Sequence, residues 1–513
     1  MRVALQDIRH LVEGKEKMKE KWARTIKKPG KKTWIFMIVA GWILSCCYLY
    51  TDMPFTTAGG LNVWTSLFDG KLALFYSTTY PGVPGTELSH SVTGGAYDFL
   101  IYVIFAIYNF PIWIWEKITG LSFISFIVTK VYVKGIAWAF SGISAYLVYK
   151  IALESGAEKK NAIWAPFFFL TSGLFWCAQV TIVGYDVIST AFGLLGVYGY
   201  LKKNKVCFYI GFAVGIATKM FVLWLFIPLL LLQEKKIYKI IGKLFMIVLP
   251  IVIPKLYFSI GAKYAAAGEP ISKKVNAVIA HFDVIDEALF PAEDIAMYTF
   301  VSMPNLPLVF VGMFAIWVLC YICKRELTSY EIIYLCTFVM TYFTLTVKMH
   351  PYWCILLAPY IALLMAMNAE KIKANLFIEF LISIGYVINK AILYYWCFGL
   401  LQIHRMIMPT HQFSFEDGVD YGKYGLERLV YILSEKIGIS EIHIAYIFSA
   451  LFVTAMVMFL VVNRPKKDVM AGEIVIENEE KQWYYLRLIF SVFVGILPMI
   501  GLVEYMLPVN WGA

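Results

Sequence analysis

The sequence predicts an all-α fold, a polytopic transmembrane helix bundle of about thirteen helices with the N-terminus inside and the C-terminus outside. Of the 513 residues, 60% are hydrophobic, 17% aromatic and only 16% charged, and the mean hydropathy is +0.68. A water-soluble fold of this size could not bury so much apolar surface. The charges also cluster between apolar runs of about 18 to 22 residues, the length that a helix needs to cross a bilayer. Examples of such runs are 33–50, 306–323 and 442–463.

Residues 1–32 form a basic arm that we predict to be cytoplasmic. Eleven Lys and Arg lie between Arg2 and Lys32, and an excess of positive charge marks the cytoplasmic side. Because this polar stretch precedes the first apolar run and no small-residue cleavage site follows that run, we expect no cleaved signal peptide. The net charge of +10 is then mainly a topology signal. We favour contact with anionic lipid headgroups over nucleic-acid binding.

Residues 33–258 form a predicted N-terminal transmembrane module with a first outer loop at 52–127. Each predicted cytoplasmic turn carries two or more Lys or Arg, so the direction of the chain alternates without a forced exception. The predicted helices of this module are 33–51, 128–150, 161–182, 186–201, 206–218, 220–232 and 243–258.

The stretch 97–115 of the first outer loop is apolar and aromatic enough to span a membrane. A span there would place Lys150, Lys159 and Lys160 outside, against the charge rule. We therefore expect a juxtamembrane helix along the outer membrane surface, which its aromatic content and Pro111 favour.

Residues 305–513 form the predicted C-terminal transmembrane module, which follows an outer loop at 259–304. A second outer loop is expected at 400–440, and a short acidic insert at 473–480. The module begins with the helix 305–323. Two helices then meet at an outer turn that contains Lys348 and His350, and the helices 376–399, 441–463 and 486–506 follow.

Cysteine and glycine residues in the apolar runs have structural explanations. Nearly all nine cysteines fall inside such runs and are interpreted as small hydrophobic side chains. Cys320 and Cys323 have the spacing of half a metal site, but no second pair and no histidine partner follows. Gly211 and Gly215 lie four apart on one helix face, which predicts close helix packing.

Polar residues gather at the predicted outer ends of the helices. Asp52 follows the first helix, Asp186 opens the fourth, Lys219 lies in a short apolar hairpin, and Lys348 with His350 forms a turn. Polar groups at membrane depth are costly and usually functional. Acids and bases from separate helices can hold a phosphate-bearing lipid at this surface. A cation would stabilise the departing phosphate, and a carboxylate would take a proton from an incoming hydroxyl.

Four stretches follow one another in the order TDMPFTTAGGLNVWTSLFDGKLALFY (51–76), TIVGYDVISTAFGLLGVYGYLKKNK (181–205), YIGFAVGIATKMFVLWLFIPLLLL (209–232) and KMHPYWCILLAPYIALL (348–364). Together they resemble the polytopic, lipid-phosphate-dependent glycosyltransferases of the C-type fold (GT-C). That group includes protein O-mannosyltransferases, aminoarabinose transferases and oligosaccharyltransferases. The resemblance implies a polyprenyl-phosphate sugar donor, and it gives Asp52 the position of the catalytic acid.

Each candidate residue has two interpretations. Asp52 is either the general base or an interfacial helix cap, and Asp186 either contacts substrate or caps its helix. Lys219 either contacts phosphate or snorkels to the interface, and His350 is either a ligand or a satisfied turn histidine. Further candidates for the lipid phosphate are Lys273, Lys274, His404, Arg405 and His411. Asp98 is the first substitute for the base, followed by Asp69, Glu87, Asp283 and Asp286.

The leading hypothesis is a membrane glycosyltransferase that moves a sugar to an extracytoplasmic acceptor in the cell envelope with inversion. The expected partners are the polyprenyl-phosphate sugar, the acceptor glycan, lipid or protein, and membrane lipids, with no nucleic acid. No metal is required, although oxygen ligands leave a divalent cation as an alternative. One alternative hypothesis is a lipid-linked glycan flippase, which would be expected to have a polar path through the bilayer or a paired repeat architecture. The other is a glycan polymerase, which calls for arginines in large outer loops, where Arg405 and Arg428 are the obvious ones.

Overall fold

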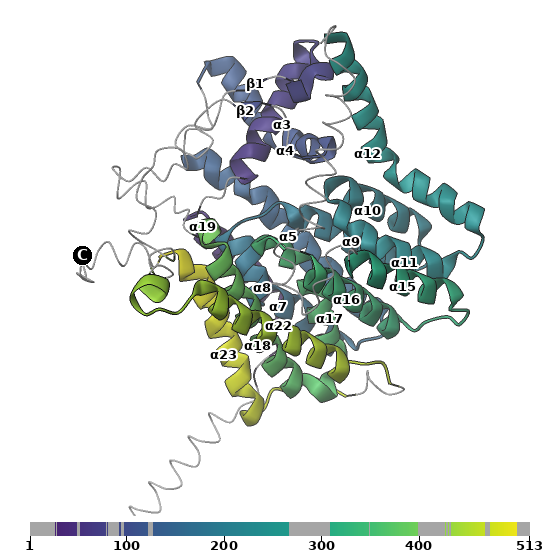
Figure 1. The fold of residues 1–513 in the computed structure, drawn as a ribbon, viewed down its shortest axis with the longest axis vertical. Coiled ribbons are helices and arrows are strands. Elements are labelled where there is room, and N and C mark those ends of the chain that lie inside the picture. Colours follow the sequence, from purple (N-terminus) through teal and green to yellow (C-terminus); the bar gives the residue numbers. More distant parts are fainter. Residues whose placement is uncertain are drawn as a thin grey trace, which may run out of the picture.

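A computed structural model of the protein describes residues 26, 28–48, 52–77, 79–80, 92–93, 97–121, 127–265, 308–347, 349–398, 426, 429, 432–466 and 472–499. These residues are almost entirely helical, which confirms the all-α part of the predicted fold class (Figure 1). Within the described part, the exception is an antiparallel pair of two-residue strands, β1 (Thr79–Tyr80) and β2 (Val92–Thr93).

The helices of the N-terminal module follow the predicted order with shifted ends. They are α2 (Lys31–Ser45), α3 (Asp52–Phe68), η1 (Leu72–Ser77), α4 (Phe99–Thr119), α5 (Ile127–Glu154), α6 (Lys159–Ala162), α7 (Trp164–Leu170), α8 (Gly173–Phe175), the π-helical turn η3 (Trp176–Thr181), α9 (Asp186–Leu201), α10 (Lys205–Thr218), η4 (Met220–Val222), α11 (Leu223–Gln233) and α12 (Ile237–Ala265).

The C-terminal module is likewise helical. Its elements are α15 (Leu308–Ile322), α16 (Ser329–Thr346), η5 (Pro351–Leu356), α17 (Ala358–Met367), η6 (Ala369–Lys371), α18 (Ile372–Leu393), α19 (Tyr395–Phe398), the π-helical turn η7 (Ile432–Lys436), α22 (Glu441–Val462), α23 (Asn478–Ile496) and η8 (Leu497–Met499). Every residue of α17 is buried, and this helix packs against α5, α7 and α16 at the centre of the molecule.

Six helices of the described chain are long and apolar enough to cross a membrane, against about thirteen expected. The number is seven if the bent pair Lys159–Leu170 and Gly173–Thr181 counts as one span. Other predicted spans are present as shorter apolar helices of 10–17 residues, such as α9 and α10. By length and composition α4 belongs to the six, whereas the sequence predicts that 97–115 lies on the membrane surface.

The first helix ends earlier than the predicted range 33–51. It ends at Ser45, and Asp52 opens the next helix instead of following the first. Lys134 of α5, whose side chain is buried, donates hydrogen bonds to the carbonyl oxygens of Ser45 and Tyr48. The last carbonyls of a helix have no partner within it, so this cation stabilises the early end.

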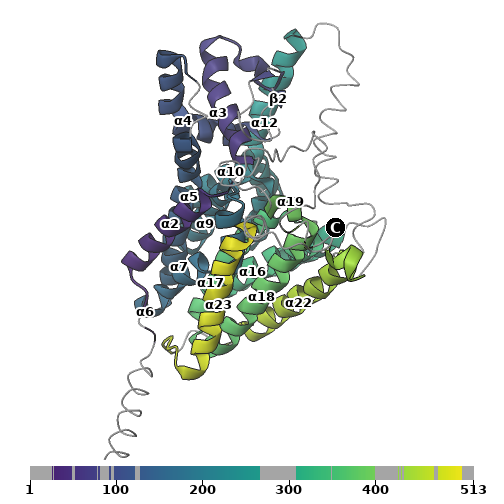
Figure 2. The same cartoon turned by 90° about the vertical axis from the view of Figure 1, so that its left-hand side faces the viewer.

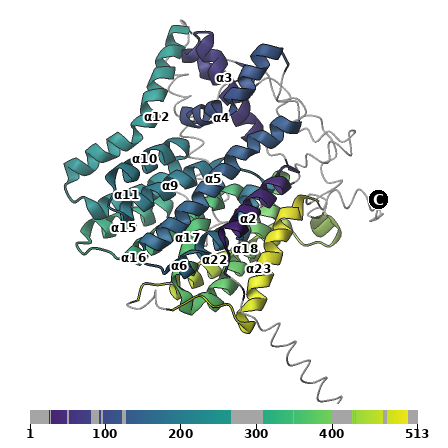
Figure 3. The ribbon, with the colours of Figure 1, turned by 180° about the vertical axis from the view of Figure 1, so that it is seen from behind.

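Helices α3 and α4 pack against each other at the upper end of the molecule, together with the C-terminal part of α12 (Figures 1 and 3). The ring of Phe258 in α12 lies 6.1 Å from that of Phe75 in η1 and 4.7 Å from that of Phe99 in α4. This aromatic contact fixes the first outer loop to α12.

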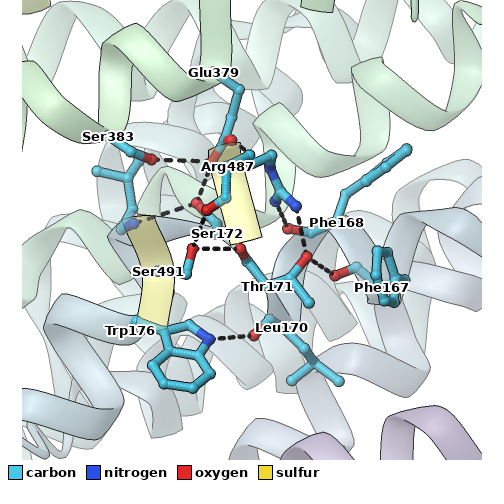
Figure 4. A network of polar contacts seen from close by, with 11 residues as sticks. Phe167, Phe168, Leu170, Thr171, Ser172, Trp176, Glu379, Ser383, Arg487 and Ser491 are labelled. Atoms are coloured by element: carbon cyan, nitrogen blue, oxygen red, sulfur yellow. Dashed lines mark hydrogen bonds and ion pairs between the residues drawn. The ribbon is translucent and has the colours of Figure 1, made fainter. Parts of the chain in front are cut away.

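The bent helix pair is stabilised by a buried polar network (Figure 4). Arg487 of α23 pairs with Glu379 of α18, and both side chains are 1% exposed. Arg487 also donates to the carbonyl oxygen of Phe168 and to the hydroxyl of Thr171, and Ser172 donates to Glu379. Polar backbone groups freed at a helix break need hydrogen-bond partners inside a membrane. This network supplies such partners at the break between α7 and α8.

Glycines allow α9 and α10 to pack closely. A Cβ atom added to Gly211 would lie 2.4 Å from the backbone nitrogen of Gly196, and one added to Gly199 would lie 2.3 Å from that of Phe208. A Cβ atom added to Gly215 would lie 3.3 Å from the backbone nitrogen of Gly193. The predicted packing role of Gly211 and Gly215 is therefore confirmed.

Segments that the sequence assigns to one side of the membrane meet at the lower end of Figure 2, near α6 and the start of α23. Glu473 pairs with Lys28 of the basic arm and with Lys160, the latter at 2.9 Å. Asn161 donates to the carbonyl oxygen of Gly472 and accepts from the amide of Ile474, both at 2.9 Å. Lys28 of the basic arm, the 158–161 turn and residues 472–474 thus lie together.

Candidate active site

An ion pair between Asp186 and Lys219 forms the centre of the candidate site. Asp186 opens α9 and Lys219 directly follows α10, so the close packing of these two consecutive helices brings both residues to the same end. Lys219 Nζ lies 2.8 Å from Asp186 Oδ1, and the side chains are 14% and 0% exposed. A buried carboxylate is strongly stabilised by such a partner.

The backbone before Asp186 is irregular. The π-helical turn η3 ends at Thr181, and Val183 has a φ of 60°. A positive φ is unfavourable for a β-branched residue, and such strain and π-helical turns concentrate at functional sites. Gly184 leaves no room for a side chain, because an added Cβ would lie 2.9 Å from the ring of Tyr352. The amide of Gln179 donates to the carbonyl oxygen of Gly184 at 3.1 Å.

Four aromatic rings surround the ammonium group of Lys219. The distances from Nζ to the ring centroids are 4.8 Å for Trp353, 5.2 Å for Tyr185, 5.6 Å for Phe221 and 5.9 Å for Tyr352. Cations are attracted to aromatic faces at these distances. The rings hold the ammonium in place, and its remaining exposed part is available to an anion.

His350 connects this aromatic cage to a second lysine. Its ring centroid lies 4.9 Å from that of Trp353 and 5.5 Å from that of Tyr394. The hydroxyl of Tyr386 donates to the His350 carbonyl oxygen at 3.0 Å. Lys390 of α18 is 4% exposed, and its Nζ lies 5.2 Å from the Tyr394 ring and 5.6 Å from the Tyr386 ring. Residues from two modules therefore form one aromatic and cationic cluster.

Asp98 lies at the edge of this cluster. It immediately precedes α4, and its Oδ1 is 3.1 Å from Nζ of Lys255 in α12. The neighbouring ring of Tyr97 packs 4.9 Å from that of Tyr185. Asp98 is thus held by a cation of its own, and the residue before it, Tyr97, contacts the cage through Tyr185.

The start of α3 reaches the same aromatic contacts. Asp52 is the first residue of this helix, and the ring of Phe55 packs 5.6 Å from that of Tyr97. Because Phe55 lies one turn from Asp52, the backbone at Asp52 is close to the edge of the cluster.

The structure thus brings Asp186, Lys219 and His350 together, with Asp98 and the start of α3 beside them. The roles assigned to these residues stay predictions. Nine other candidate residues lie outside the described residues: Glu87, Lys273, Lys274, Asp283, Asp286, Lys348, His404, Arg405 and His411.

The sequence reasoning missed most of the cage. Tyr185 directly precedes Asp186, and Trp353 follows His350 by three residues. Their closeness in sequence to Asp186 and His350 could have indicated that they belong to the site, since aromatic faces hold cations. Lys390 has a similar signal, because Tyr386 and Tyr394 lie four residues to either side of it, on the same helix face.

The chemical groups present in the cluster indicate which ligands it can bind. Within the described ranges, no group of three or more His, Cys, Asp and Glu is placed to hold a metal ion. The arrangement offers a buried carboxylate, a partly exposed ammonium, a histidine and flat aromatic faces. Such a set can bind an anionic group at Lys219 and pack a ring-shaped group against the aromatic side chains.

No model of a protein family, no curated protein sequence and no solved structure matches this chain.

Proposed function

We propose that this protein is a membrane glycosyltransferase that transfers a sugar from a polyprenyl-phosphate donor to an extracytoplasmic acceptor. The observation that carries the proposal is the pair of Asp186 and Lys219, buried among aromatic rings at one end of apolar helices. A lysine in such a place meets the needs of a phosphate whose lipid tail lies in the bilayer. The aromatic faces fit the sugar that the phosphate carries.

The proposed reaction uses a carboxylate and a cation on opposite sides of the sugar. The carboxylate of Asp52 takes the proton from the acceptor hydroxyl, whose oxygen attacks the anomeric carbon. The bond from that carbon to the phosphate oxygen breaks, and its electron pair leaves with the polyprenyl phosphate. Lys219 stabilises the charge that develops on the phosphate. Direct displacement inverts the anomeric carbon.

Asp186 acts as a positioning residue in this scheme. Its carboxylate holds Nζ of Lys219 at 2.8 Å, so the ammonium is oriented before the donor arrives. Preorganised charges stabilise a transition state more effectively than charges that must first reorient. Asp98 is less suited to the role of base, because Lys255 is 3.1 Å from its carboxylate.

The proposed topology places the Asp186 end of the molecule outside the membrane and the cluster around Glu473 inside. It includes the shorter apolar helices among about thirteen spans and lays α4 along the outer surface. The packing of α4 on α3 and its contact with α12 support a place beside the bundle.

The decisive experiment incubates purified protein with a panel of radiolabelled polyprenyl-phosphate sugars and an envelope extract as acceptor. We expect release of free polyprenyl phosphate together with a labelled product. Movement of the intact donor across a vesicle membrane without release would show a flippase instead. Absence of both activities with every donor would refute the proposal.

Asp52→Asn tests the general base within the same assay. Asn removes the charge that takes the proton and keeps the size of the side chain, so turnover should fall by about 10²- to 10⁴-fold with the melting temperature unchanged. Glu154→Gln is the control, because Glu154 is an exposed carboxylate at the end of α5 and is not among the candidates for the base. Turnover of Asp52→Asn equal to that of this control and of the unchanged protein would exclude Asp52 from the role of base.

A further inference from the structure

A cavity of about 540 Å³ opens at the end of α9 and α10 opposite to the Asp186–Lys219 pair. It lies between the α9–α10 turn, the end of α11, the first turns of α12 and the start of α16. Its lining combines aromatic and charged side chains, among them Tyr200, Lys203, Lys205, Tyr209, Lys243 and Glu326.

Three lysines and two glutamates line this cavity. Lys203 pairs with Glu326 at 2.8 Å, and Lys243 pairs with Glu234 at 2.9 Å. The first pair is 82% and 83% exposed, and exposed ion pairs contribute little stability. An incoming phosphate can therefore compete with Glu326 for Lys203. Lys205 belongs to neither pair and leaves the lining with an excess of positive charge.

Two of the helices that border the cavity, α10 and α12, expose apolar side chains within a few residues of those that line it. On α10, Val206 is 66% and Ile210 53% exposed. On α12, Ile237 is 63%, Tyr238 69% and Ile241 61% exposed. A soluble anion would gain nothing from this apolar rim, whereas an amphipathic ligand buries its chains there. The combination of a basic cavity and an apolar rim thus selects for a ligand with both parts.

We propose that this cavity binds the phosphate headgroup of an anionic phospholipid, with its acyl chains along α10 and α12. Basic pockets between transmembrane helices on the cytoplasmic side recognise such headgroups. The phosphate contacts Lys203 and Lys205, and the neighbouring aromatic side chains border the headgroup. This site is separate from the proposed catalytic cluster, and it does not depend on the glycosyltransferase proposal.

The test measures thermal stabilisation of the detergent-solubilised protein by short-chain phosphatidylglycerol, phosphatidylcholine of the same chain length, and inorganic phosphate. We expect phosphatidylglycerol to raise the melting temperature in a saturable way. Lys205→Gln should weaken its apparent affinity about fivefold, and Lys205→Glu should weaken it further. Asn204, which caps α10 through its side chain, is retained in both variants, so the helix start remains intact.

Lys71→Gln and Lys71→Glu are the matched controls, because Lys71 is an exposed lysine outside the cavity. They should bind phosphatidylglycerol as tightly as the unchanged protein. Equal weakening by the Lys71 and Lys205 variants would overturn the proposal by showing non-specific charge attraction. Equal stabilisation by phosphatidylcholine or by inorganic phosphate would also overturn it, because the cavity would then not select an anionic lipid.

Discussion

At the scale of single residues, the pair of Asp186 and Lys219 concentrates charge where the surroundings are mostly apolar. The carboxylate is fully buried, and the ammonium lies among four aromatic rings. Removing one partner of a buried pair is strongly destabilising, whereas replacing both by apolar groups is often neutral. Stability and catalysis therefore respond differently to single and double substitutions here.

A double-mutant cycle separates these two effects. Asp186→Asn and Lys219→Met alone should each lower the free energy of unfolding by about 3 kcal/mol, because each leaves a partner without its counter-charge. The double variant should recover most of that loss and should still lack transferase activity. Thermal melting and the polyprenyl-phosphate release assay measure the two quantities. A double variant that transfers sugar would show that the pair serves the fold alone.

The meeting of Asp186 and Lys219 follows from features that a sequence displays. Asp186 and Lys219 stand at the far ends of consecutive helices joined by a basic turn, so an antiparallel pair must bring them to one end. The early end of the first helix was not visible, because the apolar run continues past Ser45 and the capping cation, Lys134, comes from a distant helix. Pairing across long separations depends on tertiary packing, which local patterns do not encode.

At the scale of elements, the contact between α9 and α10 sets the geometry of the candidate site. Backbone atoms of the two helices approach so closely at Gly211 and Gly196 that a methyl group has no space. Any widening of this contact moves the start of α9 away from the end of α10. The distance between Asp186 and Lys219 therefore depends on glycines remote from both.

Gly211→Ala tests this dependence. The added methyl group should force the helices apart and lower the free energy of unfolding by about 1–3 kcal/mol, with a parallel loss of transferase activity. Gly242→Ala in α12 is the control, since nothing lies within 4 Å of its added Cβ. That variant should be neutral or slightly stabilising, because Ala favours helix more than Gly does. Thermal melting measures the stability of both variants. Equal melting temperatures for Gly211→Ala and Gly242→Ala would contradict the packing argument.

The contact of the acidic insert with two basic segments predicts a pH dependence. Hydrogen bonds from Lys28 and then Lys160 lower the pKa of Glu473 below its ordinary value of 4.5. A carboxyl group with a lowered folded-state pKa stabilises the fold above its unfolded pKa, and this contribution is lost as the pH falls through the folded value. Glu473→Gln should therefore melt at a lower temperature than the unchanged protein at pH 7.

The difference between the two proteins should shrink as the pH falls below 4.5, the ordinary value for this group. Melting curves at a series of pH values from 7 to about 3 follow this change. A difference that stays constant over this range would show that Glu473 acts through packing and not through its charge.

At the scale of the whole molecule, the described helices bring residues of one predicted side to a common end. Lys28, Lys160 and Glu473 meet at one place although they are far apart in the chain. The Asp186–Lys219 pair lies at the other end of α9 and α10 from Lys203. The helical class follows from composition and the length of the apolar runs, whereas the number of spans does not, because helix ends and bends depend on contacts such as that of Arg487.

Thiol labelling in intact cells tests the proposed orientation. In a variant without the native cysteines, Lys71→Cys should react with an impermeant thiol reagent and Lys203→Cys should not. Both positions are exposed, so access to the side chain does not differ between them. Labelling of Lys203→Cys after cell lysis provides the control for reactivity. The opposite labelling pattern in intact cells would show that the protein has the reverse orientation in the membrane, with the candidate site on the cytoplasmic side.

The buried pair of Glu379 and Arg487 can form only late in the synthesis of this protein. A ribosome makes α7, α8 and α18 before α23, so Glu379 and the carbonyl oxygen of Phe168 enter the membrane before Arg487 exists. Until then these groups lack the partner that makes them tolerable in lipid. A nascent chain that stops short of α23 keeps a Glu379 carboxylate that has the hydroxyl groups of Ser172 and Ser383 as donors but lacks its counter-charge.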